Sequence, residues 1–284
     1  MGLKAGIVGL PNVGKSTLFN AITNSHVEAA NYPFATINPN TGVVNVPDER
    51  LDFLSNLFKP ERTIPATVEF YDIAGLVRGA SKGEGLGNQF LAHIRECDAI
   101  VEVVRCFENA DIVHVEGDVD PIRDIEVINL ELVMADLDTV TKRIEKIENK
   151  ARIQKDKESL LEMSILAPIK EALEQGRPAR VVKLSEEQEL LMKGYHLLTK
   201  KPIIYVANVS EEDLMDLNNA SNYQKVVEYA HNENNEVNPD SVTFKSFKYS
   251  SLSSLESSDN SLSISHETGI TSLFSFCAYS TTFW

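Results

Sequence analysis

Short apolar runs alternate with glycine turns and helical patterns along the first part of the chain. Leu3–Val8 is rich in β-prone residues, a glycine turn follows it, and Lys15–Thr23 has the pattern of a helix. A strand, a glycine turn and a helix in this order form the opening of an α/β unit. Further buried parallel strands are predicted at residues 67–73, 99–104 and 202–206. The pattern therefore predicts the α/β class, a sheet with helices on both of its faces.

A different periodicity lies between the third and fourth predicted strands. Apolar residues recur there at alternating spacings of three and four through three heptads, which is the pattern of a coiled-coil seam. A second helical stretch, at about 160–173, ends at the breaker Gly176-Arg177-Pro178. We interpret the pair as an antiparallel α-helical coiled-coil hairpin inserted at 128–199; the alternative is an ordinary surface helix packed on the sheet. The seam residues are Leu130, Val133, Leu137, Val140, Ile144, Ile147 and Ala151, and charged residues that include Asp136 and Asp138 flank them.

The composition of the sequence changes near residue 240, where serine becomes the commonest residue. Charges are few and the helical and strand periodicities stop, which is typical of low-complexity chain. We therefore predict one discontinuous α/β domain, formed by residues 1–127 and 200–237, and an atypical serine-rich tail at 238–284. The tail stands where the last strand and helix of the sheet are expected, so their loss would leave a sheet edge uncovered.

The composition narrows the class of protein. Hydrophobic residues make up 43% of the 284-residue chain and charged residues 24%, which excludes wholesale disorder. The chain holds 27 Lys+Arg against 42 Asp+Glu, a net charge of −15, so direct DNA binding through a general clamp on the phosphate backbone is not expected. No apolar run approaches the roughly 20 residues that span a bilayer. No membrane partner is therefore expected, and three scattered cysteines favour a reduced, cytoplasmic protein.

One glycine turn carries a specific signal. The run Gly9–Ser16 matches the phosphate-loop pattern, with a strand before it and a helix after it. Its backbone N–H groups are expected to surround phosphate oxygens, Lys15 to reach the β- and γ-phosphates, and the Ser16 hydroxyl to bind Mg²⁺. The alternative is a glycine-rich turn that fits the pattern by chance. The predicted nucleotide-binding residues here are Asn12, Val13, Gly14, Lys15, Ser16 and Thr17.

A second motif, Asp72-Ile73-Ala74-Gly75, stands at the C-terminal end of the second predicted strand. There the Asp72 carboxylate is expected to hold Mg²⁺ through water, and the Gly75 N–H to bind a γ-phosphate. Asp-x-x-Gly is common by itself, but its place at a strand end after a phosphate loop makes it informative. Thr36 is a candidate second Mg²⁺ ligand on the intervening loop, the alternative being an ordinary loop threonine.

Together these motifs resemble the Obg superfamily of translation-factor-type P-loop NTPases, and within it the YchF subfamily, the Obg-like ATPases. The resemblance covers about residues 1–235. It implies a G-domain sheet with an inserted helical hairpin, hydrolysis of a nucleoside triphosphate with Mg²⁺, and the large ribosomal subunit as a partner. The residues that carry it are Gly9–Ser16, Tyr32–Pro39, Asp72–Gly75, Gly75–Leu91, Arg105–Asn109 and Asp124–Asn129.

The choice of base depends on Asn208-Val209-Ser210-Glu211, which follows the fourth predicted strand. Guanine-specific relatives have Asn-Lys-x-Asp there, whose carboxylate accepts from N1–H and the 2-amino group of guanine. Adenine lacks the 2-amino donor, and this chain has moved the carboxylate out by one methylene and replaced the lysine with Val209. We expect Asn208, Val209 and Glu211 to bind adenine, so that ATP is preferred over GTP. The alternative is a helix-capping turn with Asn208 as the N-cap.

The hydrolytic residues are less directly marked. Ras-type enzymes place a glutamine directly after Asp-x-x-Gly to orient the attacking water, whereas this chain has Leu76, which cannot hydrogen-bond water. The family resemblance assigns the water-positioning role to His114, although a lone histidine is by itself more often structural. His114 and Lys15 are therefore the predicted catalytic residues. Asn12 is a candidate for holding K⁺ beside the phosphates, by analogy with related NTPases.

The first functional interpretation is a cytosolic, Mg²⁺-dependent ATPase that acts as a slow switch in translation or stress regulation. Two alternatives stay open: a GTPase of the Obg superfamily, and a nucleotide-switched ribosome-binding module with little hydrolysis. Family members continue into a C-terminal TGS domain, which residues 238–284 replace here. We expect a truncated or frame-altered product, the alternative being a genuine divergent tail.

Overall fold

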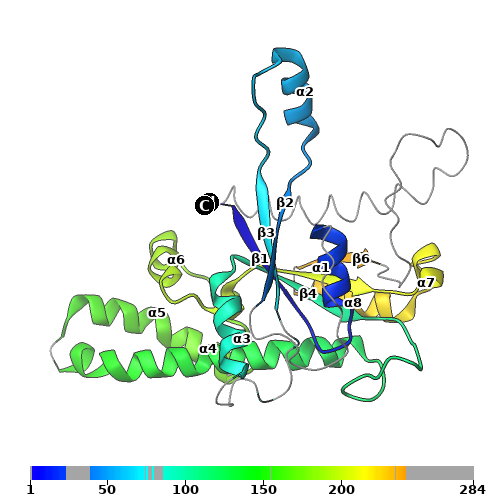
Figure 1. Cartoon of the computed structure of the whole chain (residues 1–284). Helices are drawn as coiled ribbons and strands as arrows, with labels where there is room; N and C mark the ends of the chain where they lie inside the picture. The colour runs from blue at the N-terminus through cyan, green and yellow to red at the C-terminus, as the bar shows by residue number, and fades with distance from the viewer. Residues whose placement is uncertain are drawn as a thin grey trace, which may run out of the picture. The chain divides into compact units, whose positions relative to one another are not determined.

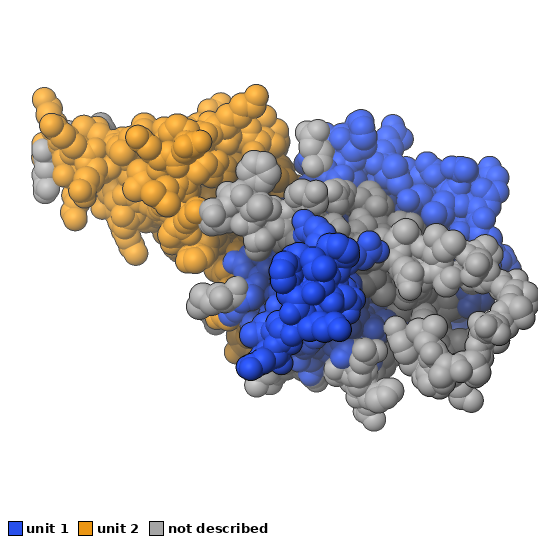
Figure 2. Space-filling view, turned by 90° about the horizontal axis from the view of Figure 1, so that it is seen from above, with its two compact units in different colours: residues 1–75, 97–122, 202–284 blue, residues 76–96, 123–201 orange. Residues whose placement is uncertain are grey.

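The computed structural model describes residues 2–23, 39–73, 75, 79, 86–153, 155–233 and 235–240. The chain divides into two compact units, coloured blue and orange in Figure 2. Unit 1 comprises residues 1–75, 97–122 and 202–284, and unit 2 comprises residues 76–96 and 123–201. The segment 76–96, which the sequence placed in the α/β domain, groups with the helical unit, where the Gly79 N–H donates to Glu131 Oε1 at 2.6 Å.

Unit 1 is built on a six-stranded sheet in the order β2-β3-β1-β4-β5-β6 (Figure 1). Every residue of β4 and β5 is buried, which explains why apolar residues stand on both faces of these strands instead of alternating; Glu102 and Arg105 are the charged residues of β4. All neighbouring pairs are parallel except β2 with β3. The strands are β1 (Leu3–Val8), β2 (Asn40–Asn45), β3 (Thr67–Asp72), β4 (Ala99–Arg105), β5 (Ile203–Asn208) and β6 (Glu236–Asp240).

Helices cover both faces of this sheet, as predicted. Helix α1 (Lys15–Thr23) packs along β1, β2 and β3, and α8 (Ser221–Asn232) packs along β5 and β6. The chain crosses from β1 to β3 in one direction along the sheet and from β5 to β6 in the other. Because such crossovers are right-handed, the two helices lie on opposite faces. A short helix, α7 (Glu211–Met215), follows β5.

Helix α2 (Glu49–Phe58) lies between β2 and β3, at the end of their ribbon (Figure 1). None of its residues is buried, and Phe53 and Phe58 are 66% and 73% exposed. Its two ends are instead closed locally. The Asp48 carboxylate accepts from the Arg50 N–H at the N-cap, and Lys59 adopts a left-handed conformation at the C-cap, donating its N–H to Ser55 O.

Two strands differ from the sequence prediction. β2 was not predicted, because its residues alternate between half-buried and exposed and so lack an apolar run. β6 reaches Asp240, so the prediction that regular sheet structure ends at residue 237 is wrong, and the edge of β5 is paired. The tail was predicted to begin there because the helical and strand periodicities stop after Val237. β6 also contains Pro239. A proline has no N–H to donate, but a strand at the edge of a sheet tolerates one.

Unit 2 contains two long helices that lie between β4 and β5 in the chain, α4 (Pro121–Arg152) and α5 (Lys157–Glu174). They form an antiparallel hairpin (Figure 1). Within the described ranges, no helix is both long and apolar enough to cross a membrane. The remaining elements of the unit are α3 (Leu86–Glu96), η1 (Ala179–Val181), α6 (Glu186–Lys193) and η2 (Leu198–Lys200).

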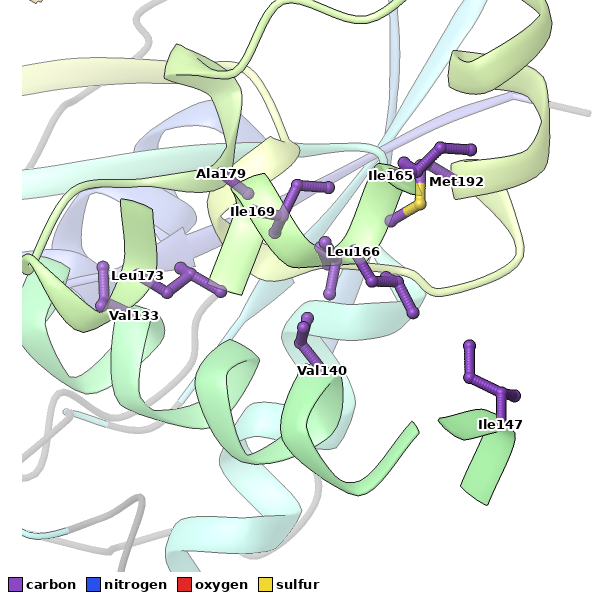
Figure 3. Packing of buried hydrophobic residues seen from close by; sticks show 10 residues of the cluster. Val133, Val140, Ile147, Ile165, Leu166, Ile169, Leu173, Ala179 and Met192 are labelled. Carbon is purple, nitrogen blue, oxygen red and sulfur yellow. The ribbon is translucent and has the colours of Figure 1, made fainter. Parts of the chain in front are cut away.

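The hairpin buries one stripe of α4 against α5 (Figure 3). Val133, Val140 and Ile147 recur every seven residues and pack in one cluster with residues of α5, η1 and α6. Leu130, predicted as the first seam residue, is 54% exposed instead. The reason is length, because α5 has 18 residues against the 32 of α4 and its last cluster residue, Leu173, lies near Val133 (Figure 3).

Asp136 is a second departure from the predicted pattern. The sequence placed it among the charged flanks of the seam, but the structure buries it completely. Its carboxylate accepts from the N–H groups of Leu198 and Thr199 at 2.9 and 2.7 Å and from the Thr199 hydroxyl at 2.7 Å. Arg95 lies 3.8 Å from it. Asp136 therefore joins α4 to η2 and satisfies three buried donors.

We expect Asp136→Ala to lower the free energy of unfolding by roughly 3–5 kcal/mol, because it leaves buried donors without their acceptor. Asp138→Ala is the matched control, since Asp138 is exposed and pairs only with Lys142 one turn away. Its expected cost is about 0.5 kcal/mol or less. Urea unfolding followed by circular dichroism measures both, and equal losses would show that Asp136 does not hold unit 2 together.

Candidate functional site

The loop Gly9–Ser16 joins β1 to α1, and its backbone is strongly curved. Asn12 and Gly14 have φ angles of +62° and +104°, and the helix begins with the Leu18 N–H bonded to Gly14 O at 2.9 Å. A Cβ atom added at Gly14 would lie 2.5 Å from Asn208 Nδ2. Glycine is therefore required at position 14 both for its backbone conformation and for the close approach of Asn208.

Lys15 is buried in this loop. Its Nζ donates to Leu10 O at 2.7 Å, so the ammonium is held inside the curve of the loop. Burial lowers the pKa of Lys15 to about 8, and the nearby Asp72 carboxylate opposes that shift. A partly desolvated cation of this kind gains strongly when an anion such as a phosphate arrives.

Asp72 ends β3 beside the loop, and its carboxylate receives hydrogen bonds from two side chains, those of Ser16 and Asn40. Asn40 faces Asp72 directly across the β2–β3 pair. Burial raises the pKa of Asp72, while Ser16, Lys15 and Asn40 act in the opposite direction. The Ser16 hydroxyl and the Asp72 carboxylate are adjacent hard oxygen donors. This donor set fits Mg²⁺, which prefers oxygen ligands and keeps several waters.

Gly75 lies against the phosphate loop as well. A Cβ atom added there would come within 3.0 Å of Pro11 N, so only glycine allows this approach without a shift of the backbone. Thr17 lies in the first turn of α1. The other predicted Mg²⁺ ligand, Thr36, is outside the described residues.

The C-terminal end of β5 is tied to the phosphate loop. Asn208 is buried and its Nδ2 donates to Val13 O at 2.9 Å, while Val209 is buried beside it. Glu211 is exposed as the first residue of α7. The N-cap of α7 is Ser210, whose hydroxyl accepts from the Asp213 N–H, so the alternative that Asn208 caps this helix is wrong. Asn208 thus reaches the loop from the strand end at which the sequence placed it, and Val209 and Glu211 follow it in the chain.

His114 is buried in the loop between β4 and α4. Its Nδ1 accepts from the Glu116 N–H at 3.2 Å, so a neutral ring carries its proton on Nε2. The preceding residue, Val113, accepts a hydrogen bond from Asn12 Nδ2 of the phosphate loop at 3.2 Å. Asn12, predicted as a K⁺ ligand, therefore uses its amide to connect the His114 loop to the phosphate loop.

Two residues of this region were not assigned a role from the sequence. Asn40 binds Asp72 from a strand that has no apolar pattern. Arg105 ends β4 with its side chain 1% exposed, and its guanidinium donates to the carbonyls of Phe107, Asn109 and Ile112. The available signal was a charged residue that directly follows an apolar strand.

Comparison with known proteins finds similar sequences over most of the chain. A family model described as 50S ribosome-binding GTPase matches residues 4–155. The chain is 59% identical over 237 residues to the ribosome-binding ATPase YchF of Bacillus subtilis (strain 168), a match that covers 84% of this chain and 64% of that protein. It is 57% identical over 212 residues to the protein of the same name from Escherichia coli O157:H7, covering 75% of this chain and 58% of the other.

A solved structure is similar over most of the fold. The structure of the Schizosaccharomyces pombe YchF GTPase matches with a TM-score of 0.70 at 42% identity, and covers 86% of this chain and 66% of that one. The chain thus spans less than two thirds of the length of the two bacterial relatives that it matches.

We expect Gly14→Ala to lower the thermal midpoint much more than Gly176→Ala does. Both glycines have a positive φ angle, so both substitutions carry a backbone cost of about 1–2 kcal/mol. Only the new Cβ at position 14 meets a neighbour, Asn208; nothing lies within 4 Å of a Cβ at position 176. Differential scanning calorimetry measures both variants. Equal midpoints would mean that Asn208 does not approach the loop as closely as the structure shows.

Proposed function

The chain belongs to the family described as 50S ribosome-binding GTPases, its resemblance to YchF proteins is confirmed, and we propose that it binds and hydrolyses ATP with Mg²⁺. The observation that carries the proposal is the convergence of Lys15, Ser16 and Asp72. All three lie within one network at the edge of the sheet. The Lys15 ammonium attracts the Asp72 carboxylate electrostatically, and the Ser16 hydroxyl forms a hydrogen bond with that carboxylate.

The proposal gives specific roles to residues of the phosphate loop and to three residues outside it. Backbone N–H groups of residues 12–17 bind phosphate oxygens, and the Lys15 ammonium neutralises charge on the β- and γ-phosphates. Ser16 and Asp72 would hold Mg²⁺, Asp72 through water; the bound ion would supply further neutralisation of the phosphate charge. The Gly75 N–H contacts the γ-phosphate. Thr36 would complete the ion site, and K⁺ beside Asn12 is a further candidate cation.

Hydrolysis would proceed by in-line attack of water on the γ-phosphorus, with cleavage of the bond to the β-phosphate oxygen. His114 is proposed to position this water, because Leu76 follows Asp-x-x-Gly in place of glutamine. The Nε2–H of a neutral His114 is the group suited to that contact. Lys15 and the loop amides would supply most of the catalysis by stabilising charge that develops in the transition state.

ATP is proposed as the preferred nucleotide, with GTP weaker. The support is the Asn208-Val209-Ser210-Glu211 run, which lacks the lysine and the aspartate of a guanine reader. A protein discriminates strongly between bases only when its polar groups pair with the polar groups on the edge of the base. A carboxylate that is displaced from N1–H and the 2-amino group therefore gives guanine no advantage over adenine. Asn208 and Val209 would line the base side of the site, with Glu211 at its rim. A GTPase is the alternative that this run argues against.

The proposed setting is cytoplasmic, with the large ribosomal subunit as the partner. The support is that the bacterial relatives are named ribosome-binding ATPases. A second candidate function is a ribosome-binding module that changes state when a nucleotide binds and hydrolyses it little. The residue at position 76, which is leucine and not glutamine, favours this candidate. Measurement of hydrolysis separates the two.

We expect His114→Ala to lower the rate of single-turnover phosphate release from ATP by roughly 100-fold while the ATP Kd stays within about twofold. The reason is that His114 would contact the attacking water and not the ground-state nucleotide. His231→Ala, at an exposed position of α8, is the control and should behave as the wild type. An unchanged rate in His114→Ala would remove this residue from catalysis, and no release from the wild type would favour the switch module.

Calorimetric titration of ATP and GTP into the purified chain with Mg²⁺ tests the base preference. We expect ATP to bind at least about tenfold more tightly, a difference of about 1.4 kcal/mol. Val209→Lys together with Glu211→Asp restores the pattern of a guanine reader and should narrow or reverse the preference. GTP binding more tightly than ATP in the wild type would overturn the adenine assignment.

A further inference from the structure

The loop that carries His114 has little regular structure of its own. It connects β4 to α4 over residues 106–120, which form only turns, bends and irregular backbone. A loop of this kind is held in one arrangement only if hydrogen bonds from neighbouring groups fix its backbone. Hydrolysis requires such an arrangement, because a water-positioning group must be placed to a fraction of an ångström.

Arg105 supplies three of those bonds. Its Nε donates to Phe107 O at 3.1 Å, one terminal nitrogen to Ile112 O at 3.0 Å and the other to Asn109 O at 3.2 Å. The guanidinium also lies over the ring of Phe107, 4.6 Å from its centre. One side chain thus fixes three carbonyls between the start of the loop and a point two residues before His114.

The bonds on either side of Arg105 hold the rest of the path to His114. At the start of the loop the Cys106 N–H donates to Asn208 O at 2.8 Å. At the His114 end, Asn12 Nδ2 donates to Val113 O, one residue beyond the last carbonyl that Arg105 holds. The two residues before His114 are therefore held by two different side chains, Arg105 from the end of β4 and Asn12 from the phosphate loop.

We propose that Arg105 is a positioning residue for hydrolysis, which acts by fixing the His114 loop; this rests on the function proposed above. Arginine is suited to the task because its planar guanidinium presents five donors in a rigid fork, whereas lysine carries its three donors on one nitrogen at the end of a flexible stem. A lysine at position 105 has no second or third nitrogen and cannot reproduce the fork that bonds the carbonyls of Phe107, Asn109 and Ile112 together. The carbonyls that it leaves unbonded would turn toward water and move the backbone before His114.

The effect of the residue should fall on the chemical step. The three guanidinium bonds described above end on the His114 loop and not on the residues that would hold the phosphates or the base. A change at Arg105 is therefore expected to displace His114 while leaving nucleotide affinity nearly intact. A purely structural role would instead lower affinity and rate together, or act equally with and without His114.

The test is a double-mutant cycle in the full chain with Arg105→Lys and His114→Ala. Single-turnover phosphate release gives the rate, and calorimetry with a non-hydrolysable ATP analogue gives the Kd. We expect Arg105→Lys to lower the rate roughly 10- to 100-fold with the Kd within about twofold, since small displacements of a catalytic group cost this much. In the His114→Ala background the same change should cost about twofold or less.

The matched control is Arg180→Lys, which alters an arginine of unit 2 that also donates to a backbone carbonyl, that of Thr199. Its rate should stay within about twofold of the wild type. The proposal is overturned by an unchanged rate in Arg105→Lys, by an equal loss in both His114 backgrounds, or by a rise in Kd that matches the loss of rate.

A readout that needs no activity separates this proposal from the one above. If His114→Ala alone leaves the rate unchanged, the catalytic role of His114 fails, and the nitrogen resonances of His114 then decide whether Arg105 positions it. We expect Arg105→Lys to shift or broaden the Nδ1 signal, because the bond from Glu116 loosens; an unchanged signal overturns the proposal. Should Arg105→Lys lack native circular dichroism, Phe107→Leu takes its place, and the same two outcomes apply.

Discussion

The parallel pairing of β1 with β3 and β4 is the constraint on which the site depends. The register sets Ile7 opposite Asp72 and Val8 opposite Glu102, so β1 and β3 end at nearly the same level and β4 runs three residues further, to Arg105. Because parallel strands present their carboxyl ends at one edge of the sheet, whatever follows them meets there. The phosphate loop after β1, Asp72 at the end of β3 and the His114 loop after β4 come together for this reason. β5 adds Asn208 to the same edge.

The parts of this arrangement that carry an apolar run or a glycine pattern were predictable from the sequence. The phosphate loop was found because strand, glycine spacing and helix are local features, and β4 and β5 were found because both of their faces are covered. Asp72 followed from its place at a strand end. The heptads of α4 predicted Val133, Val140 and Ile147 as a seam, and the cluster of unit 2 contains all three. The heptad pattern also placed Leu130 in the seam, but this residue is exposed. A heptad repeat in one helix does not reveal how long the partner helix is.

What the sequence could not give depends on partners that leave no pattern. Arg105 bonds to backbone carbonyls, and any residue has a carbonyl, so nothing in residues 107–112 marks them as its acceptors. Asn40 meets Asp72 through the register of an antiparallel strand whose side chains are half exposed. Asp136 has the composition of a surface residue on a charged helix, and only the fold of the segment around η2 makes it a buried acceptor.

Helix α2 has a different relation to the rest of unit 1. It buries no residue, so its helical state depends on the Asp48 cap and the Lys59 turn and not on packing. A helix of ten residues without tertiary support is marginal in water. Its amide hydrogens should therefore exchange with solvent through brief local fraying, independently of the global opening that exposes β4 and β5. Helix α2, at the end of the β2–β3 ribbon, is therefore expected to unfold locally while the sheet stays folded.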